Sequence, residues 1–219
     1  NFYHLKKIIK RYSINTIYHA AAYKHVPMLE MNIVSGVYNN VIGTYNLAKV
    51  SDEFGVECMV LISSDKAVRP TNVMGASKRM SELVLPAYSQ QSNCCFSMVR
   101  FGNVLDSAGS VVPLFREQIQ KGGPLTVTHK DITRYFMSIP EAVGLVLEAN
   151  IFASNGDTYF LDMGKPIKIL DLAKKMIRLY GFDFTFDEED KNKILITFTG
   201  LRSGEKLHED LTSGNNYLS

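Results

Sequence analysis

The chain has 219 residues, of which 46% are hydrophobic and 21% are charged, as in an ordinary soluble globular protein. Its 24 basic and 22 acidic residues leave a formal net charge of +2, which argues against nucleic acid or an anionic membrane as the main partner. No apolar run reaches the roughly eighteen residues of a membrane-spanning helix, and the opening residues are too polar and basic for a signal peptide.

The first half of the chain alternates between helix and strand patterns. It opens in an amphipathic helix, with Leu5, Ile8 and Ile9 on one face. Apolar runs predict strands at 14–22, 56–62 and 95–100, and helical spacing predicts helices at 33–54 and 73–91. Nearly continuous apolar strands separated by helices predict an α/β fold with a doubly wound parallel sheet.

The second half, beyond residue 103, has shorter predicted elements. Helices are expected near 111–121, from Ser138 to about residue 153 and at 168–180, and strands near 125–128, 157–162 and 194–199. Ser138 and Glu141 have the spacing of a capping box, which predicts where the second of these helices begins. We expect one α/β domain at 1–104, with 130–153 packing on it. A small α/β lobe at 105–129 and 154–219 is expected to fold over the carboxyl edge of the sheet.

The three cysteines, Cys58, Cys94 and Cys95, have neither metal-ligand nor disulfide-framework spacing. We therefore expect reduced packing residues and a cytoplasmic protein, although a parent protein could still be anchored on the cytoplasmic face of a membrane. His19 and His25 suggest a metal pair, but no third ligand cluster supports them, so no metal is expected.

The residues most indicative of chemistry lie between the second strand and the next helix. Ser63-Ser64-Asp65-Lys66 closes the apolar run at 58–62, and Met74-Gly75-Ala76-Ser77-Lys78 opens the helix that follows. Ligands of open α/β sheets bind at the carboxyl ends of strands, so a hydroxyl, a carboxylate and two amines there predict a proton-transfer site. Taken alone, Asp65-Lys66 is also compatible with an ordinary exposed ion pair.

Five segments in order resemble the extended short-chain dehydrogenase/reductases, and within them the polysaccharide-biosynthesis group of UDP-N-acetylglucosamine 4,6-dehydratases. They are His19-Ala-Ala-Ala-Tyr-Lys-His-Val-Pro27, Asn40-Val-Ile-Gly-Thr44, Ser63-Ser-Asp-Lys-Ala-Val-Arg-Pro-Thr-Asn-Val-Met-Gly-Ala-Ser-Lys78, Arg100-Phe-Gly-Asn-Val104 and Leu201-Arg-Ser-Gly-Glu-Lys206. The resemblance covers nearly the whole chain and implies a Rossmann-like fold and a homo-oligomer. It also implies that 1–104 is the remainder of a dinucleotide-binding domain and that 105–129 and 154–219 form a lobe that binds the UDP-sugar. No G-x-G-x-x-G turn occurs, so we expect the family's first β-α-β unit to be absent from these residues.

The resemblance implies an internal redox elimination on a UDP-sugar. NAD or NADP would take hydride from sugar C4 and return it to C6, giving a 4-keto-6-deoxy sugar nucleotide for surface polysaccharide. Asp65 would be the acid for the C6 hydroxyl, and Lys66 the base for C5. Burial and nearby Lys78 would have to lower the pKa of Lys66 for this role. Ser64 would hydrogen-bond the C4 oxygen, and Lys78 would hold the nicotinamide ribose and supply positive charge.

Met74 is the main departure from the superfamily, whose usual Tyr-x-x-x-Lys pair appears here as Met74-x-x-x-Lys78. A thioether cannot take the proton of the C4 hydroxyl as a tyrosinate can. We therefore expect Lys66, or a water held by Ser64 and Lys78, to take that proton, while Met74 lines the pocket of cofactor and substrate.

The remaining candidate residues are also implied by the resemblance. Together with Met74 and Lys78, the cofactor would contact Ala20, Ala21 and Val104. The substrate would contact Ser64, Lys24, Asn103, Arg134, Arg202 and Glu205. Among these, Arg202 and Glu205 would grip the diphosphate and ribose of UDP, because a guanidinium fork suits phosphate oxygens. His25 stays open between a structural and a functional role.

Two other functions remain open at this stage. A nucleotide-sugar 4-epimerase would need the same hydride transfer but no acid for C6, so the Asp65-Lys66 pair favours the dehydratase. A catalytically inactive nucleotide-sugar-binding protein is supported by Met74 and by the missing phosphate-binding turn. Loss of water from UDP-N-acetylglucosamine, followed by mass, separates these functions.

Overall fold

The computed structural model describes residues 1–211, which divide into two compact units. The first unit comprises Asn1–Phe101 and Ala142–Asp162, with Asp210 also assigned to it, and the second comprises Gly102–Glu141 and Met163–Glu209. Among the described residues, no helix combines the length and the hydrophobicity needed to cross a membrane.

The first unit is built on one parallel sheet. Its strands are β1 (Thr16–His19), β2 (Cys58–Ile62), β3 (Cys95–Arg100) and β8 (Thr158–Phe160), in the spatial order β1-β2-β3-β8. Each neighbouring pair is parallel. The three strand predictions in the first half of the chain are confirmed, and so is the parallel sheet. Their carboxyl ends lie at one edge, directly before the segments that carry the predicted site.

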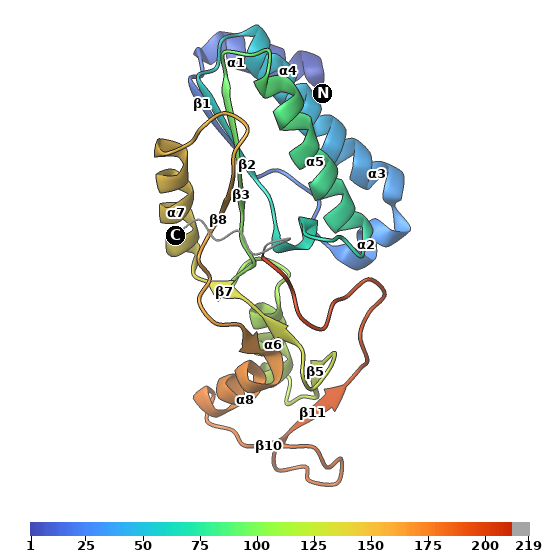
Figure 1. Ribbon diagram of the computed structural model, residues 1–219. Coiled ribbons are helices and arrows are strands. Elements are labelled where there is room, and N and C mark those ends of the chain that lie inside the picture. Colours follow the sequence, from blue (N-terminus) through green and yellow to red (C-terminus); the bar gives the residue numbers. More distant parts are fainter. Residues whose placement is uncertain (212–219) are drawn as a thin grey trace. The chain divides into compact units, whose positions relative to one another are not determined.

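Helices cover both faces of this sheet (Figure 1). They are α1 (Phe2–Tyr12), α2 (Val26–Met31), α3 (Ile33–Val37), α4 (Gly43–Glu53), α5 (Val73–Ser89) and α7 (Ile139–Ile151). In Figure 1, α4 and α5 lie on one side of the strands and α7 on the other. Apolar side chains of α1, α4, α5 and the strands form one core, which includes Ala48, Met59, Leu85 and Phe96.

The helix expected at 33–54 contains a π-helical turn at Tyr38–Ile42, between α3 and α4. Asn40 lies in this turn, and its carbonyl oxygen accepts hydrogen bonds from the hydroxyls of Thr44 and Ser81 at 2.7 and 2.9 Å. Such bonds compete with the regular helical ladder, and π turns of this kind are frequent at functional sites. Helical spacing alone predicted the helix but gave no sign of the turn.

The second unit has its own small sheet and core. β5 (Leu125–Val127), β10 (Phe184–Thr185) and β11 (Ile194–Phe198) form a parallel sheet in the order β10-β11-β5, packed by α6 (Val111–Gln120) and α8 (Ile169–Leu179). Two further pairs join β4 (Asn103–Val104) to β7 (Phe136–Met137) and β6 (Thr133–Arg134) to β9 (Ile167–Lys168).

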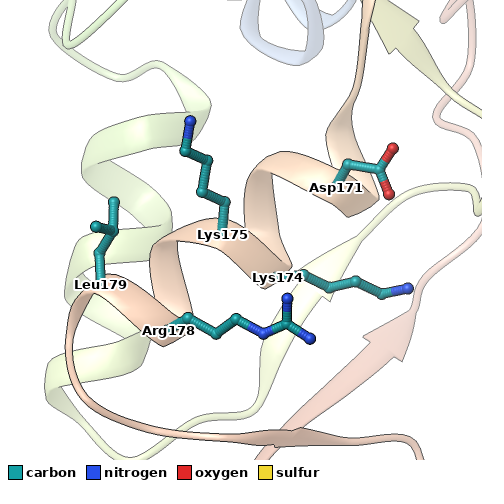
Figure 2. A pocket seen from close by; sticks show the side chains of 5 residues that line it. All are labelled: Asp171, Lys174, Lys175, Arg178 and Leu179. Atoms are coloured by element: carbon teal, nitrogen blue, oxygen red, sulfur yellow. The ribbon is translucent and has the colours of Figure 1, made fainter.

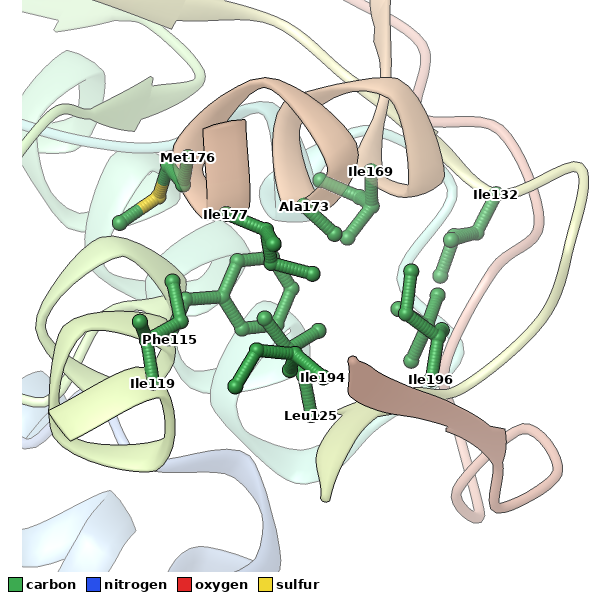
Figure 3. Packing of buried hydrophobic residues seen from close by; sticks show 11 residues of the cluster. Phe115, Ile119, Leu125, Ile132, Ile169, Ala173, Met176, Ile177, Ile194 and Ile196 are labelled. Carbon is green, nitrogen blue, oxygen red and sulfur yellow. The ribbon is translucent and has the colours of Figure 1, made fainter. Parts of the chain in front are cut away.

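α8 is strongly amphipathic. Figure 2 shows its outer face, where Asp171, Lys174, Lys175, Arg178 and Leu179 line a surface pocket of about 390 Å³. Its inner face is apolar and contributes to the second core, shown in Figure 3, around the fully buried ring of Phe115. This separation of charged and apolar faces is what a surface helix needs to pack on a sheet.

The division of the chain differs from the expected domain boundaries. Residues 102–104 belong to the second unit and Asp210 to the first, and two longer stretches also differ. Residues 154–162 belong to the first unit, because β8 pairs with β3. Residues 130–141 belong to the second unit, because β6 and β7 pair with β9 and β4 there. The predicted capping box is confirmed, since the backbone amide of Ser138 donates to Glu141 at 3.2 Å and that of Glu141 to the Ser138 hydroxyl at 3.3 Å.

One close approach fixes the first turn of α5 in place. A Cβ atom added at Gly75 would lie 2.2 Å from the carbonyl oxygen of Lys66. We therefore expect Gly75→Ala to destabilise the protein by about 1–3 kcal/mol, because the turn containing Lys66 must move away from α5. Gly144→Ala in α7 is the matched control, because nothing lies within 4 Å of its added Cβ.

Denaturant unfolding of the complete protein measures both variants. The control should unfold at an unchanged or higher denaturant concentration, since alanine is favoured over glycine within helices by about 1 kcal/mol. Equal midpoints for Gly75→Ala and the unchanged protein would contradict the close packing.

Candidate active site

A single turn of 3-10 helix, η2 (Asp65–Ala67), carries the predicted acid and base directly after β2. Ser64 caps this turn, because its hydroxyl oxygen accepts from the backbone amide of Lys66 at 3.3 Å. The same hydroxyl donates to Asp65 Oδ1 at 2.9 Å, and Lys66 Nζ donates to the same oxygen at 3.0 Å. The structure therefore brings together the three side chains that the sequence singled out.

Asp65 is the most deeply buried member of this group, with no exposed surface. Its Oδ1 atom receives both hydrogen bonds, whereas Oδ2 has no hydrogen-bond partner among residues 1–211. Leaving a buried polar atom unpaired costs free energy, so such atoms need an explanation. The vacant acceptor position on Oδ2, next to a hydroxyl and an ammonium, suits proton exchange with a bound hydroxyl group once the turn moves enough to expose this oxygen.

Met74 and Lys78 lie four residues apart on α5 and are both buried, at 5% and 7% exposure. Lys78 Nζ donates to the carbonyl oxygen of Ile62, the last residue of β2, at 2.8 Å. Burial lowers the pKa of Lys78 to about 8, and the charge of Glu82 opposes this shift. A buried ammonium bonded to a neutral carbonyl is available to stabilise negative charge on a ligand.

His19 ends β1 and is buried in its neutral form. Burial and the nearby charge of Lys78 lower the pKa of His19 to about 4. The Thr44 hydroxyl donates to the Asn40 carbonyl, so its oxygen accepts from His19 Nε2, 3.0 Å away. This assigns the proton to Nε2. His19 therefore adds no positive charge beside Lys78.

The segment after β1 carries the predicted contacts Ala20, Ala21 and Lys24, all of them exposed. Asn40 ties this segment to α5. Its side chain bonds both the backbone amide and the carbonyl of Tyr23, at 2.8 and 3.0 Å, and donates to the Ser77 hydroxyl at 2.9 Å. Asn40 was not predicted as a site residue, although it lies in one of the five segments of the resemblance.

Glu82 is a second buried residue near the site that the sequence did not predict. It is 1% exposed and lies one turn after Lys78 on α5. Its carboxylate binds the Ser63 hydroxyl at 2.7 Å and two nitrogens of Arg100 at 2.5 Å each. The only sequence signal for Glu82 is its helical spacing from Lys78. That spacing does not predict its partners, Ser63 after β2 and Arg100 on β3.

In the second unit, β4 contains the predicted contacts Asn103 and Val104. The backbone amide of Asn103 donates to the Tyr135 carbonyl at 2.9 Å, next to the pairing of β4 with β7. This pairing fixes the backbone of both residues, and their roles toward substrate and cofactor remain predictions.

Glu205 and Arg134 meet in the same unit, whereas Arg202 reaches Glu205 through its backbone. Glu205 Oε1 accepts from Arg134 Nη2 at 3.3 Å, and Oε2 accepts from the Arg202 amide at 3.1 Å. The Arg134 guanidinium also donates to the carbonyl oxygens of Thr133, Lys206 and Leu207. These bonds show Arg134 holding the segment after Glu205 to β6, and its predicted phosphate contact remains a prediction.

No predicted site residue lines the pocket on α8. Within residues 1–211, no group of three or more histidines, cysteines or carboxylates is placed to hold a metal ion. The three cysteines are free thiols, and burial raises the pKa of Cys94 to about 12.

Several known proteins are similar to this chain in sequence. The probable polysaccharide biosynthesis protein EpsC of Bacillus subtilis is 50% identical over 208 residues, and the capsular polysaccharide biosynthesis protein CapD of Staphylococcus aureus is 51% identical over 210 residues. Both matches cover 95% of this chain but only 34% of the relative, so the chain spans about a third of their length. A UDP-glucose 4-epimerase of Rickettsia canadensis is 37% identical over 205 residues, which are 92% of this chain and 57% of that protein.

Solved structures share the fold. Pen from Bacillus thuringiensis superimposes with a TM-score of 0.87 at 34% identity, over 96% of this chain and 63% of that one. DesIV, a dTDP-glucose 4,6-dehydratase from Streptomyces venezuelae, was solved with NAD and TYD bound. It superimposes with a TM-score of 0.84 at 20% identity, over 97% of this chain and 68% of that one. These likenesses confirm the Rossmann-like α/β fold.

The family model described as polysaccharide biosynthesis protein matches residues 1–219. Together with the two relatives that share half of the aligned residues, this match shows that the chain belongs to the polysaccharide biosynthesis protein family.

Proposed function

We propose that the complete protein is a hydro-lyase that catalyses the NAD(P)-dependent 4,6-dehydration of a UDP-N-acetylhexosamine, with UDP-N-acetylglucosamine as the expected substrate. The observation that carries this proposal is the Ser64–Asp65–Lys66 cluster, in which one buried carboxylate binds a hydroxyl and an ammonium. An elimination at C5 and C6 needs a paired acid and base on one face of the sugar. Membership of the polysaccharide biosynthesis family supports the same class of substrate.

Asp65 and Lys66 supply the acid and the base in this proposal. Lys66 Nζ donates a 3.0 Å hydrogen bond to Asp65 Oδ1, so the two side chains are in contact. In the proposed elimination Asp65 gives a proton to the leaving C6 hydroxyl, and Lys66 takes the proton from C5. The C4 hydroxyl gives its proton to a water held by Ser64 and Lys78, or to Lys66, which must then release it before it takes the proton from C5. Ser64 hydrogen-bonds the C4 oxygen, and Lys78 stabilises the negative charge that develops there.

The residues present fit the nicotinamide end of a dinucleotide. Ala20 and Ala21 are exposed at the carboxyl end of β1, where small side chains let a ligand approach the backbone. Lys78 and Met74 lie on α5, with the Lys78 ammonium fixed by the carbonyl at the end of β2. NAD(P), when bound, accepts hydride from C4 and returns it to C6. DesIV was solved with NAD bound, which is consistent with this assignment.

Arg202 and Glu205 hold the UDP part of the substrate in this proposal, with Lys24 and Asn103 contacting the sugar and Val104 near the cofactor. The Glu205 carboxylate is anchored by Arg134 and by the Thr128 hydroxyl, both at 3.3 Å. Its position is therefore set by β6 and by the residue after β5. A positioned carboxylate suits ribose hydroxyls, and the Arg202 guanidinium suits phosphate oxygens.

A nucleotide-sugar 4-epimerase is the second candidate, favoured by the 37% identity to the Rickettsia canadensis epimerase. An epimerase has little use for the Asp65–Lys66 pair, so we rank it second. Incubation of the complete protein with UDP-N-acetylglucosamine distinguishes the candidates by mass, because only dehydration releases water. UDP-sugar binding without any turnover would instead identify an inactive binding protein.

We expect Asp65→Asn to abolish water loss, with a decrease of at least about 100-fold, because general acid catalysis contributes that much or more. Product mass measures the loss, and the absorbance of reduced cofactor measures hydride transfer from C4 separately. Lys66→Met is the companion variant and should block release of the C5 proton. If Lys66→Met leaves hydride transfer from C4 undiminished, Lys66 is not the base for the C4 hydroxyl.

The pH dependence of turnover tests Lys78. Burial lowers the pKa of Lys78 to about 8, so its positive charge is present below that pH and lost as the pH rises through it. Because the charge stabilises oxygen anion character at C4, kcat should fall along an alkaline limb centred near pH 8. A kcat that stays constant from pH 7 to about 10 would exclude this role for the Lys78 charge.

The first unit also carries exposed apolar side chains that suit self-association. α2 and α3 pack against α5, and large apolar side chains on these helices and the π turn are exposed, namely Met28, Met31, Ile33, Val34, Tyr38, Met80 and Leu83. Exposed apolar patches of this kind mark interaction sites. We propose that a second copy of the chain covers this surface.

Light scattering with size-exclusion chromatography tests the self-association. Val34→Asp should dissociate the complete protein to monomers, because a charge buried in an apolar interface is costly. Leu179→Asp on α8 is the control, since Leu179 is similarly exposed but lies outside the patch. A monomeric unsubstituted protein, or equal masses for all three, would contradict the proposed interface.

A further inference from the structure

Glu82 has no part in the chemistry proposed above, yet it is the most heavily bonded carboxylate near it. Both of its oxygens are satisfied, by the Ser63 hydroxyl, by two Arg100 nitrogens and by Arg79 Nη1 at 3.0 Å. Burial alone would raise the pKa of Glu82, but the hydrogen bonds from Arg100 and Ser63 lower it below its ordinary value. Glu82 is therefore an ionised anchor with no oxygen left for a ligand.

Two successive turns of α5 hold two successive residues at the end of β2. Lys78 Nζ binds the carbonyl of Ile62 at 2.8 Å, and one turn later Glu82 binds the side chain of Ser63 at 2.7 Å. Ser63 is the residue directly before the Ser64–Asp65–Lys66 turn. Its amide also donates to the Val99 carbonyl of β3 at 2.8 Å, and Arg100 follows on that strand. Glu82 thus joins α5, β2 and β3 at the base of the candidate site.

We propose that Glu82 is a positioning residue for the proposed dehydration, on which this inference rests. Its carboxylate fixes Ser63, and through Ser63 the turn that carries Asp65 and Lys66, and it keeps a negative charge one helical turn from the Lys78 ammonium. A displacement of the turn by a fraction of an ångström would impair proton transfer, because catalytic geometry tolerates little error.

The charge of Glu82 also affects Lys78, whose pKa it raises against the effect of burial. The other titratable or charged groups near this part of α5 are His19, Glu30, Asp65, Lys66, Arg79 and Arg100. The π turn and α4, which also pack on α5, carry Tyr38, Tyr45, Lys49, Asp52 and Glu53. Within residues 1–211, only the charge of Glu82 raises the pKa of Lys78 against burial. His19 is neutral, Arg100 is bound to Glu82 itself, and Asp65 and Lys66 are bound to each other. Loss of the Glu82 charge should therefore lower the pKa of Lys78.

Three variants of the complete protein test the proposal. Glu82→Gln removes the charge and keeps the shape, and Ser63→Ala removes only the link to the turn. Arg79→Gln is the control, because Arg79 binds the same carboxylate from an exposed position. We expect kcat to fall at least about tenfold in the first two, with KM for the UDP-sugar within about twofold, the signature of lost transition-state geometry. The alkaline limb should move to lower pH in Glu82→Gln alone.

A second measurement does not depend on turnover. Competitive acetylation of lysines with acetic anhydride, followed across pH by mass spectrometry, reports the pKa of Lys78 directly. We expect a lower value in Glu82→Gln and unchanged values in Ser63→Ala and Arg79→Gln. If the unsubstituted protein releases no water from any UDP-sugar, the proposed function fails, whereas the labelling still tests the action of Glu82 on Lys78.

Unchanged kcat in folded Ser63→Ala would overturn the positioning role. An unchanged pKa of Lys78 in folded Glu82→Gln would overturn the electrostatic part. If Glu82→Gln does not fold, as breaking a buried ion pair can cause, Ser63→Ala decides alone, because it leaves the Glu82–Arg100 pair intact.

Discussion

The packing of α5 against the end of β2 is the constraint on which the candidate site depends. Gly75 lets the helix approach the backbone of Lys66, and Lys78 binds the last carbonyl of the strand one turn later. Protein interiors are packed too densely to absorb an added atom without movement. The acid–base turn and the helix with Met74 and Lys78 therefore have one relative position, set mainly by backbone groups and by a residue without a side chain.

Buried charges in the first unit follow a consistent arrangement. Asp65 is bound to Lys66, and Glu82 to Arg100, so each buried carboxylate has a cationic partner. Lys78 is bound to a neutral carbonyl instead, and burial lowers its pKa as a result. A buried cation whose bonded partner carries no charge is costly in the free protein. In the proposed function, negative charge that develops on the substrate beside Lys78 offsets this cost. Strongly shifted pKa values of this kind are frequent at functional sites.

The sequence predicted the elements better than their contacts. The strands at 58–62 and 95–100 and the helix at 73–89 follow from apolar runs, helical spacing and the end signals around them. The hydrogen bonds of the π turn at Asn40 and of Glu82 join residues far apart in the chain, which periodicity does not encode. In contrast, Ser64, Asp65 and Lys66 were predicted as one site because they are adjacent in sequence.

Met74 shows how the remaining groups divide the chemistry. A tyrosine at this position would take the C4 proton and would use the lysine one turn later to lower its own pKa. A thioether neither takes a proton nor needs that charge, so in the proposed reaction the Lys78 ammonium acts on the substrate oxygen itself. The proposal then assigns proton transfer to the hydroxyl, carboxylate and amine of η2 and its cap, which share one hydrogen-bonded network. If the proposed roles hold, methionine at position 74 leaves proton transfer to the segment that Gly75 and Glu82 contact.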